Sequence, residues 1–267
     1  MITWFFRKKQ ADAPIVKKGG DDFISLASHE LRSPMSIIKW YTEILLDEDA
    51  GPLTEDQRKY LTTIESSNQR AIDLVRSLLN VSRLDLGTFS ISPVEINMHS
   101  LIQEAKVVFS KEIEAKHLEI IEEEKSIKNI QADKNLCLAI TKNIIGNAIL
   151  FSKEGGKVFV TTSVIPPGEK VGEVTVGEES ILISVRDTGI GIPDTDKPKI
   201  FSKMFKASNV KDSDSVGSGL GLYITKSILD YVGGTIGFIS TEGVGSTFSI
   251  TLPTRGMERK EGRTTLD

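Results

Sequence analysis

Apolar and small residues recur every three or four positions in the first third of the chain, which is the spacing of one helix face. The first run comprises Ile24, Ala27, Leu31, Pro34, Ile38, Tyr41 and Leu45. The second run comprises Leu61, Ile64, Asn68, Ala71, Val75, Leu78 and Ser82. The turn-forming segment 49–52 separates them, so the pattern predicts a helical hairpin over 21–88. Because one hairpin covers its stripe only in part, we expect two copies to pair into the four-helix bundle of a homodimer. Packing against a second domain is the alternative.

The pattern changes after residue 88, where short alternating runs and longer helical runs follow one another. These runs predict helices at 98–117, 134–151, 196–205 and 220–232. They predict strands at 118–124, 127–131, 156–165, 180–186, 235–240 and 246–252. The expected fold class is therefore α+β, with the hairpin followed by an α/β domain at 89–254. Residues 1–20 are interpreted as an N-terminal tail or membrane-proximal stub, and 255–267 as a polar tail.

The amino-acid composition of the chain excludes some classes of function. A net charge of −4 and a pI near 5.6 provide no basic surface for nucleic acid. The single Cys137 excludes an internal disulfide and favours a reducing, cytoplasmic location. The aromatic start of the chain, 1–6, precedes the basic residues 7–9 and is too short to span a bilayer. We interpret 1–9 either as a segment lying close to a membrane or as a disordered tail.

His29 is the first candidate for chemistry. Counting Ile24 as heptad position a places His29 at f, which points away from the partner helix and into water. An exposed imidazole has a pKa near ~6.5, so it is often neutral and can act as a nucleophile. Glu30 lies beside it and could take up a proton as the attacking nitrogen forms its bond. A lone surface histidine is more often merely solvated, so the assignment depends on residues further along the chain.

Three segments of the second domain suit a phosphorylated ligand. Asp187–Pro193 follows a predicted strand, which places a carboxylate at the strand end and two glycines in the turn behind it. Gly217–Leu222 opens a predicted helix, where free backbone N–H groups favour phosphate. Asn143 and Asn147 lie four residues apart on one helix face, where their amide oxygens could hold a hydrated Mg²⁺ that bridges phosphates. Each segment alone is also explained by turns or exposed polar residues.

Together these segments resemble the sensor histidine kinases of two-component signalling, over roughly 23–253. The sequence Ser28-His29-Glu30-Leu31-Arg32-Ser33-Pro34 is similar to the phosphoacceptor box of that family. The remaining motifs follow in the family's order: the N box at 143–152, the G1 box at 187–193, the F box at 200–206, the G2 box at 217–222 and the glycine-threonine motif at 243–248. The resemblance implies a dimerisation and phosphotransfer hairpin joined to an ATP-binding domain of the Bergerat fold, a mixed sheet backed by helices.

The resemblance also implies a role for each matching residue. His29 would accept the γ-phosphoryl group of ATP with help from Glu30, and a response regulator's receiver domain would then take it. Asn147 would bind Mg²⁺, Asn143 would support the phosphates, and Asp187 would accept from the adenine amino group with help from Thr247 through water. The residues that would shape the pocket or reach the phosphates are Gly189, Gly191, Ile192, Lys203, Lys206, Gly217, Gly219, Leu220, Gly221 and Leu222.

Some positions depart from the family pattern. Leu150 stands where the N box usually has Lys or Arg, and Lys206 replaces the usual Arg of the F box. Ser33 replaces the Thr with which many members dephosphorylate their regulator. One alternative is therefore a nucleotide-binding pseudokinase that docks a regulator without transferring phosphate. Another is a gyrase-type ATPase, but that branch carries a Glu base at the position of Asn143.

Overall fold

The computed structural model describes residues 18–87, 89–125, 129–210 and 217–262, with side chains from Glu30 onward except that of Glu124. Its N-terminal part is a hairpin of two long helices, α1 (Lys18–Leu46) and α2 (Glu55–Asp85), as the sequence predicts. The α2 helix starts at a capping box in which Thr54 and Gln57 satisfy each other's backbone N–H groups. Midway along the hairpin, buried Asn68 donates to the backbone oxygen of Met35 at 2.8 Å and fixes the register of the two helices.

The second domain is built on a five-stranded mixed sheet in the order β2-β4-β7-β9-β8. Its strands are β2 (Glu119–Glu124), β4 (Lys157–Ile165), β7 (Ser180–Asp187), β8 (Thr235–Thr241) and β9 (Gly245–Pro253). The β2–β4 pair is parallel and the other pairs are antiparallel. This arrangement confirms the expected α+β fold with a mixed sheet.

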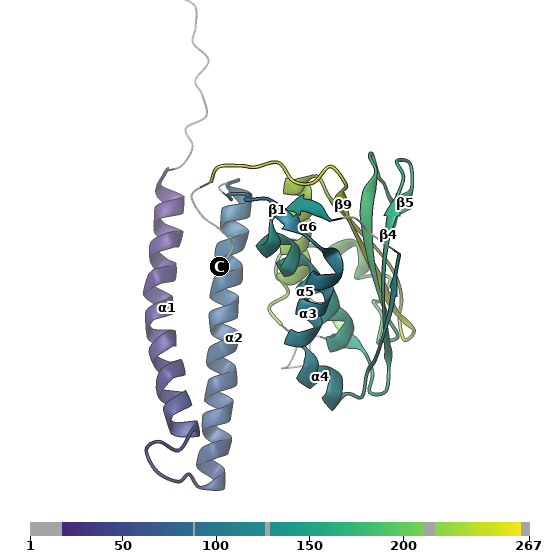
Figure 1. Ribbon diagram of the computed structural model, residues 1–267. Helices are drawn as coiled ribbons and strands as arrows, with labels where there is room; N and C mark the ends of the chain where they lie inside the picture. Colours follow the sequence, from purple (N-terminus) through teal and green to yellow (C-terminus); the bar gives the residue numbers. More distant parts are fainter. Residues whose placement is uncertain (1–17, 88, 126–128, 211–216, 263–267) are drawn as a thin grey trace, which may run out of the picture.

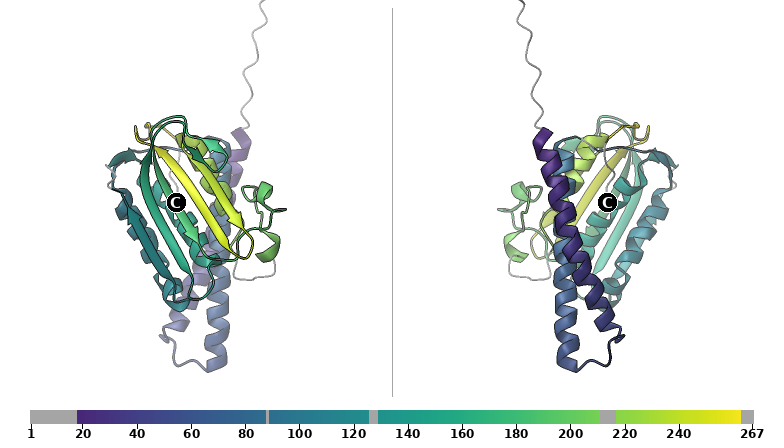
Figure 2. Two further views of the ribbon diagram at one scale, coloured as in Figure 1. Left: turned by 90° about the vertical axis from the view of Figure 1, so that its right-hand side faces the viewer. Right: turned by 90° about the vertical axis from the view of Figure 1, so that its left-hand side faces the viewer.

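Helices cover the face of the sheet that is turned toward the hairpin (Figures 1 and 2). They are α3 (Met98–Val108), α4 (Ser110–Ala115), α5 (Lys134–Phe151) and α6 (Gly221–Val232). The core lies between helices and sheet, where Ile140, Ile144, Ile183 and Ile250 are at most 2% exposed. Cys137 is buried in this same core, where burial raises the pKa of its thiol to about 12. It therefore packs as a small apolar residue.

Two short antiparallel pairs of strands complete the domain. Strand β1 (Val94–Ile96) pairs with β3 (Ile130–Ala132), and β5 (Lys170–Val171) pairs with β6 (Val174–Thr175). The β5–β6 hairpin packs against β8, where the backbone of Val171 lies so close to Gly237 that a Cβ there would be 2.2 Å from the Val171 oxygen. A glycine is required at that crossing.

Three expectations about local structure are wrong. The predicted helix 98–117 is broken at Phe109 into α3 and α4. The predicted helix 196–205 is only a 3₁₀ turn, η1 (Lys197–Lys199), because Pro198 lies inside the segment and Met204 takes a left-handed φ of 57°. The expected polar tail from 255 is folded as far as Lys260, as described next.

The segment 256–260 closes the domain at the joint with the hairpin. Met257 is buried in the core and its N–H donates to the oxygen of Gln131 at 2.7 Å. Lys260 exchanges two backbone hydrogen bonds with Ile91, and its ammonium lies 3.9 Å from the ring centroid of Tyr231. The Tyr231 hydroxyl in turn donates to the oxygen of Phe89. The far end of the chain thus fixes the first residues after the hairpin.

The exposed side chains of α1 include apolar residues that the hairpin leaves uncovered. Leu31, Ile38 and Tyr41, three members of the predicted stripe, are 47%, 45% and 56% exposed. Each helix in the described ranges falls short of the apolar length that a bilayer crossing requires. The expectation of membrane proximity through 1–9 falls on residues outside those ranges.

Candidate functional site

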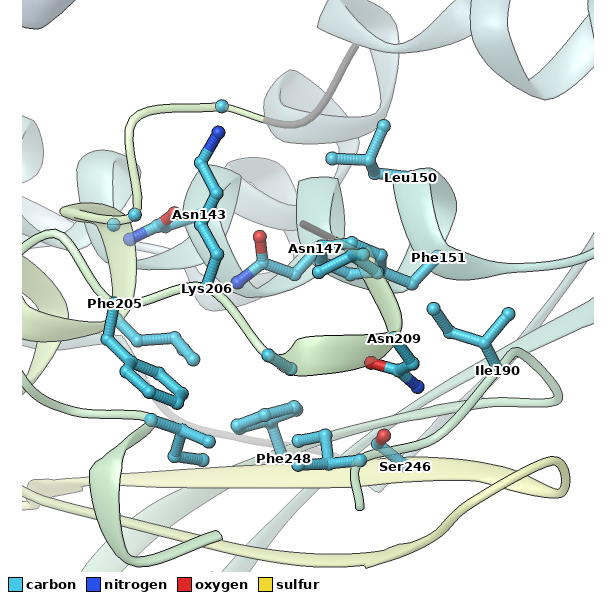
Figure 3. Close-up of a pocket in the computed structure, with 18 of the residues that line it drawn as sticks. Asn143, Asn147, Leu150, Phe151, Ile190, Phe205, Lys206, Asn209, Ser246 and Phe248 are labelled. Carbon is cyan, nitrogen blue, oxygen red and sulfur yellow. The ribbon is translucent and has the colours of Figure 1, made fainter. Parts of the chain in front are cut away.

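A cavity of about 300 Å³ lies between α5, the turn after β7, strand β9 and the segments that flank α6 (Figure 3). The structure brings ten of the predicted ligand-binding residues to its walls: Asn143, Asn147, Asp187, Gly191, Ile192, Lys206, Gly217, Gly219, Gly221 and Leu222. Aromatic and aliphatic side chains supply the rest of the lining, including Phe151, Ile190, Phe205 and Phe248. An apolar cavity with a few convergent polar groups suits a flat heterocycle with a polar tail.

Asp187 ends β7 and points into this cavity with only 6% of the residue exposed. Its Oδ1 accepts from the backbone N–H groups of Gly189 at 2.8 Å and Ser246 at 3.2 Å. Burial raises the pKa of this carboxyl above its ordinary value, although hydrogen bonds from the backbone N–H groups of Gly189, Ser246 and Asp187 itself oppose the shift. Neither the Gly189 nor the Ser246 bond involves Oδ2, the other oxygen of this cavity-lining carboxylate.

The turn after Asp187 requires its glycines. A Cβ on Gly189 would lie 2.2 Å from the oxygen of Phe151, at the end of α5. Gly191 has a φ of 64°, and a Cβ there would lie 2.0 Å from the oxygen of Thr241. The turn is therefore held tightly between α5 and the β8–β9 hairpin. This contact fixes the position of the Asp187 carboxylate.

The two asparagines of α5 differ in their contacts. Asn143 donates from Nδ2 to the hydroxyl of Thr225 on α6 at 2.7 Å. Its Oδ1 lies so close to Gly221 that a Cβ on that glycine would be only 2.3 Å from this oxygen. Asn143 therefore ties α5 to the start of α6. Asn147 lines the cavity beside it (Figure 3). Its neutral amide oxygen fits a Mg²⁺ that keeps most of its waters and binds phosphates. The described residues contain no cluster of three acidic, His or Cys side chains that would hold a metal by themselves.

The start of α6 forms the end of the cavity suited to phosphate. Gly219 has a φ of 72°, and a Cβ there would lie 2.7 Å from the oxygen of Phe205. Gly217 and Gly221 line the cavity, and the first N–H groups of α6 have no helical partner. Lys206 lines the cavity as well and brings a positive charge.

Four predicted residues lie outside the cavity lining. Gly189 donates its N–H to the cavity-lining Asp187, and Leu220, only 1% exposed, is buried between the lining residues Gly219 and Gly221. The Lys203 ammonium is 2.5 Å from the Asp85 carboxylate at the end of α2.

Thr247 is the fourth residue, and here the prediction was one residue off. Successive residues of β9 face opposite sides of the sheet, and Ser246 and Phe248 are the ones that line the cavity. Ser246, not Thr247, lies beside Asp187. The alternation of β9 was the signal that could have identified Ser246 and Phe248 from the sequence.

Asn209 and Ser77 are among the other lining residues that the sequence did not indicate. Asn209, in the 3₁₀ turn η2 (Ser208–Val210), donates to the oxygen of Gly191 at 3.0 Å and lies across the cavity from Phe151 (Figure 3). Ser77 belongs to α2 of the hairpin and still lines the cavity. Its position in the chain gave no indication of that role, because it depends on how the two domains pack.

The predicted catalytic residues of the helical hairpin, His29, Glu30 and Ser33, belong to α1. Glu30 and Ser33 are exposed. His29 lies in the preceding turn of the same helix, and its side chain is outside the part that the structure describes.

Two family models match the chain in the order hairpin, then sheet domain. Residues 21–87 match the His Kinase A (phospho-acceptor) domain. Residues 132–256 match the histidine kinase-, DNA gyrase B- and HSP90-like ATPase family. Together the models match well over half of the chain, which belongs to the sensor histidine kinases of two-component systems.

Individual relatives are similar along nearly the whole chain. It is 30% identical to the sensor protein GacS of Pseudomonas syringae pv. syringae over 92% of this chain and 26% of that protein. It is 32% identical to the sensor histidine kinase WalK of Bacillus subtilis over 87% of this chain and 36% of that protein. The crystal structure of full-length ShkA in complex with AMPPNP has a TM-score of 0.70 at 26% identity, covering 91% of this chain and 48% of that one. The chain thus spans about a quarter to a third of the length of these curated relatives.

Proposed function

We propose that this chain is an ATP-dependent protein histidine kinase that phosphorylates His29 and then passes the phosphoryl group to an Asp of a response regulator. The observation that carries the proposal is the composition of the cavity wall. A buried strand-end carboxylate, a pair of asparagines and a glycine-rich helix start line one cavity, and Ser77 of the phosphoacceptor hairpin lines the same cavity. The similarity to ShkA, whose structure contains AMPPNP, supports ATP as the ligand.

Each part of the cavity has a distinct task in this proposal. Oδ2 of Asp187 would accept from the adenine amino group, and Phe248 and Ile190 would pack against the ring. Lys206 and the N–H groups at the start of α6 would bind the phosphates. A bound Mg²⁺, held by Asn147 and phosphate oxygens, would neutralise negative charge. Phosphoryl transfer requires mainly such positioning and charge neutralisation.

The transfer step itself belongs to His29 and Glu30. A ring nitrogen of neutral His29 would form a bond to the γ-phosphorus while the bond to the bridging oxygen breaks, and that electron pair would leave with ADP. Glu30 would take the proton from the other ring nitrogen. The receiver domain's Asp would later attack the same phosphorus and release the imidazole.

Labelling with γ-labelled ATP and Mg²⁺ tests the proposal. We expect wild-type protein to acquire phosphate that is labile to acid and stable to base, and His29→Gln to acquire none. Unlabelled wild-type protein that still binds nucleotide would favour the pseudokinase, for which Leu150 at the rim of the cavity is the supporting feature. Steady phosphate release in both proteins would favour an ATPase. Against an ATPase, the amide of Asn143 cannot act as a base and already donates to Thr225.

We also propose that the kinase works as a homodimer. The uncovered apolar residues of α1, which include Leu31, Ile38 and Tyr41, would be buried between two hairpins in a four-helix bundle. Gel filtration with light scattering over a range of concentrations tests this arrangement. A mass of one chain at every concentration would exclude it.

A further inference from the structure

The α5 helix ends beside the nucleotide cavity without a glycine cap. An α-helix leaves its final carbonyl groups unpaired, and a glycine in the left-handed region often closes such an end. Here the cap residue is Ser152, whose φ of −67° and ψ of 144° are extended and lead the chain away from the helix. The carbonyl groups of 149–152 must therefore find their donors outside the helix.

Lys116 supplies most of these donors. Its ammonium donates to the oxygens of Ile149 at 3.1 Å, Leu150 at 2.6 Å and Ser152 at 3.1 Å. Its backbone oxygen accepts from the N–H of Gly155 at 2.8 Å. A lysine ammonium has three N–H groups, so these contacts use all of them. Its positive charge also suits the negative end of the helix dipole.

The turn between α4 and β2 holds Lys116 in place. The N–H of Lys116 donates to the oxygen of Glu112 at 3.1 Å, at the end of α4. The next residue, His117, takes a left-handed φ of 51°, after which the buried Leu118 donates its N–H to the oxygen of Ile113. Burial lowers the pKa of the Lys116 ammonium below its ordinary value. The lysine thus projects from a fixed turn into a partly buried position.

The remaining carbonyl at the end of α5 connects this helix to the turn after Asp187. The oxygen of Phe151 accepts from the N–H of Ile190 at 3.2 Å, and Gly189 lies so close to that oxygen that a side chain would not fit. The oxygen of Ile190 in turn accepts from the N–H of Gly243 at 2.7 Å. A shift of Phe151 would therefore move the turn and the carboxylate that precedes it.

The elements joined in this way form one end of the nucleotide cavity. Leu150 and Phe151 line it from α5, and Asp187 and Ile190 line it from the end of β7 and the turn. Lys116 is not one of the lining residues. It can influence a bound nucleotide only through the residues that it holds.

We propose that Lys116 is a positioning residue for the nucleotide. Its ammonium closes the end of α5 and holds Phe151, and through Phe151 the turn after Asp187, in the geometry that receives the adenine ring. The consequence for ATP rests on the proposed kinase function, whereas the positioning of the turn does not.

Three variants test this role. Lys116→Met keeps an unbranched side chain and removes the ammonium, whereas Lys116→Arg keeps the positive charge and the N–H donors. Lys111→Met is the matched control, because it makes the same change on the exposed surface of α4. Hydrogen exchange of 187–192 in the nucleotide-free protein measures how firmly the turn is held. Titration with a fluorescent ATP analogue, and competition by ATP and ADP, measure the consequence for binding.

We expect Lys116→Met to weaken binding of the analogue about tenfold, the lower end of the loss seen when groups that support metal ligands are removed. Exchange of 187–192 should accelerate by a similar factor. ATP and ADP should lose the same factor in affinity, because the adenine end of the cavity is the part displaced. Lys116→Arg should restore exchange and affinity toward those of the wild type, and Lys111→Met should change neither.

The dependence of binding on pH provides a second test that does not need Lys116→Met to fold. Toward the ordinary lysine pKa of about 10.4, the wild type loses the charge at position 116, whereas the guanidinium of Lys116→Arg keeps it. The two proteins share every other titratable group. Binding of the analogue should therefore weaken more in the wild type than in Lys116→Arg as the pH rises. An equal response of the two proteins would contradict the proposal.

Other results would also overturn it. A lower unfolding temperature of Lys116→Met with unchanged exchange and affinity would mean that the lysine only stabilises the fold. A larger loss for ATP than for ADP would place its effect at the phosphates and not at the adenine end. If the wild-type protein does not bind the analogue, the proposed kinase function fails, and the exchange data still decide whether Lys116 holds the turn.

Discussion

Replacing Asp187 by Asn tests adenine recognition most directly, because the change keeps the side chain's shape and removes its charge. Oδ1 of Asp187 is already engaged by Gly189 and Ser246, and the amide oxygen of Asn can take over both bonds. The Asp187→Asn variant should therefore fold normally. The substitution replaces Oδ2, the oxygen that would accept from the adenine amino group, by an amide N–H₂ group.

We expect nucleotide affinity to fall about 10- to 100-fold in Asp187→Asn. A hydrogen bond to a charged group contributes about 1.5–3 kcal/mol, and 1.4 kcal/mol corresponds to tenfold in affinity. Titration with a fluorescent ATP analogue measures the change. Asp230→Asn makes the same chemical change on the exposed surface of α6 and should leave affinity unaltered. Equal affinity of Asp187→Asn and wild type would refute the assignment of Asp187 to the adenine site.

The same variant has an opposite expected effect on the empty protein. Burial raises the pKa of Asp187, so the ionised carboxylate is less favourable in the folded than in the unfolded state. At neutral pH, Asp187→Asn should therefore raise the thermal unfolding temperature in the absence of nucleotide. Below the carboxyl's ordinary pKa of about 3.9 the difference should vanish, because both states are then protonated. A variant that is less stable than wild type at neutral pH and equally so in acid would contradict this reasoning.

Three further predictions concern the cavity walls. Ser246→Val should weaken nucleotide binding by crowding the adenine end, whereas Thr247→Val should leave the affinity of the same fluorescent analogue unchanged; the reverse would restore Thr247 to the site. Gly221→Ala should lower the free energy of unfolding in urea by about 1–3 kcal/mol, because the added methyl group would overpack against Asn143 of α5. Gly177 has no atom of the described residues within 4 Å of the position that an added methyl group would take, so Gly177→Ala should not lower the free energy of unfolding. Leu150→Lys should raise nucleotide affinity up to about fivefold at low salt, with the gain lost as salt is added; no gain at low salt would mean that this position does not reach the phosphates.

Local sequence patterns accounted for much of the architecture. The capping box at Thr54 and Gln57 and the apolar stripes specify the hairpin without any tertiary information. The residue that ends a strand can be recognised in the same way, which is why Asp187 was found. The local pattern did not predict the conformation of 196–205. The expected helix is reduced to a 3₁₀ turn there, and Met204 takes a left-handed φ that a helix cannot accommodate.

Long-range contacts explain the remaining errors. Lys203 and Asp85 are 118 residues apart, and no periodicity relates them. Met257 looked like part of a polar tail because its neighbours are charged, yet the core of the domain buries it. The glycine-threonine motif does not specify which face of β9 its residues take, and the alternation of the strand directs Ser246 and Phe248, not Thr247, to the cavity.

The return of residues 256–260 to Ile91 has a practical consequence for work with this protein. An affinity tag, fluorophore or fusion partner attached shortly after Lys260 would lie beside the joint between the helical hairpin and the ATP-binding domain, close to Tyr231 and Phe89. Such an attachment would crowd this joint, so a reporter is better placed at the exposed Glu173 in the turn of the β5–β6 hairpin, on the side of the sheet remote from the α1–α2 hairpin.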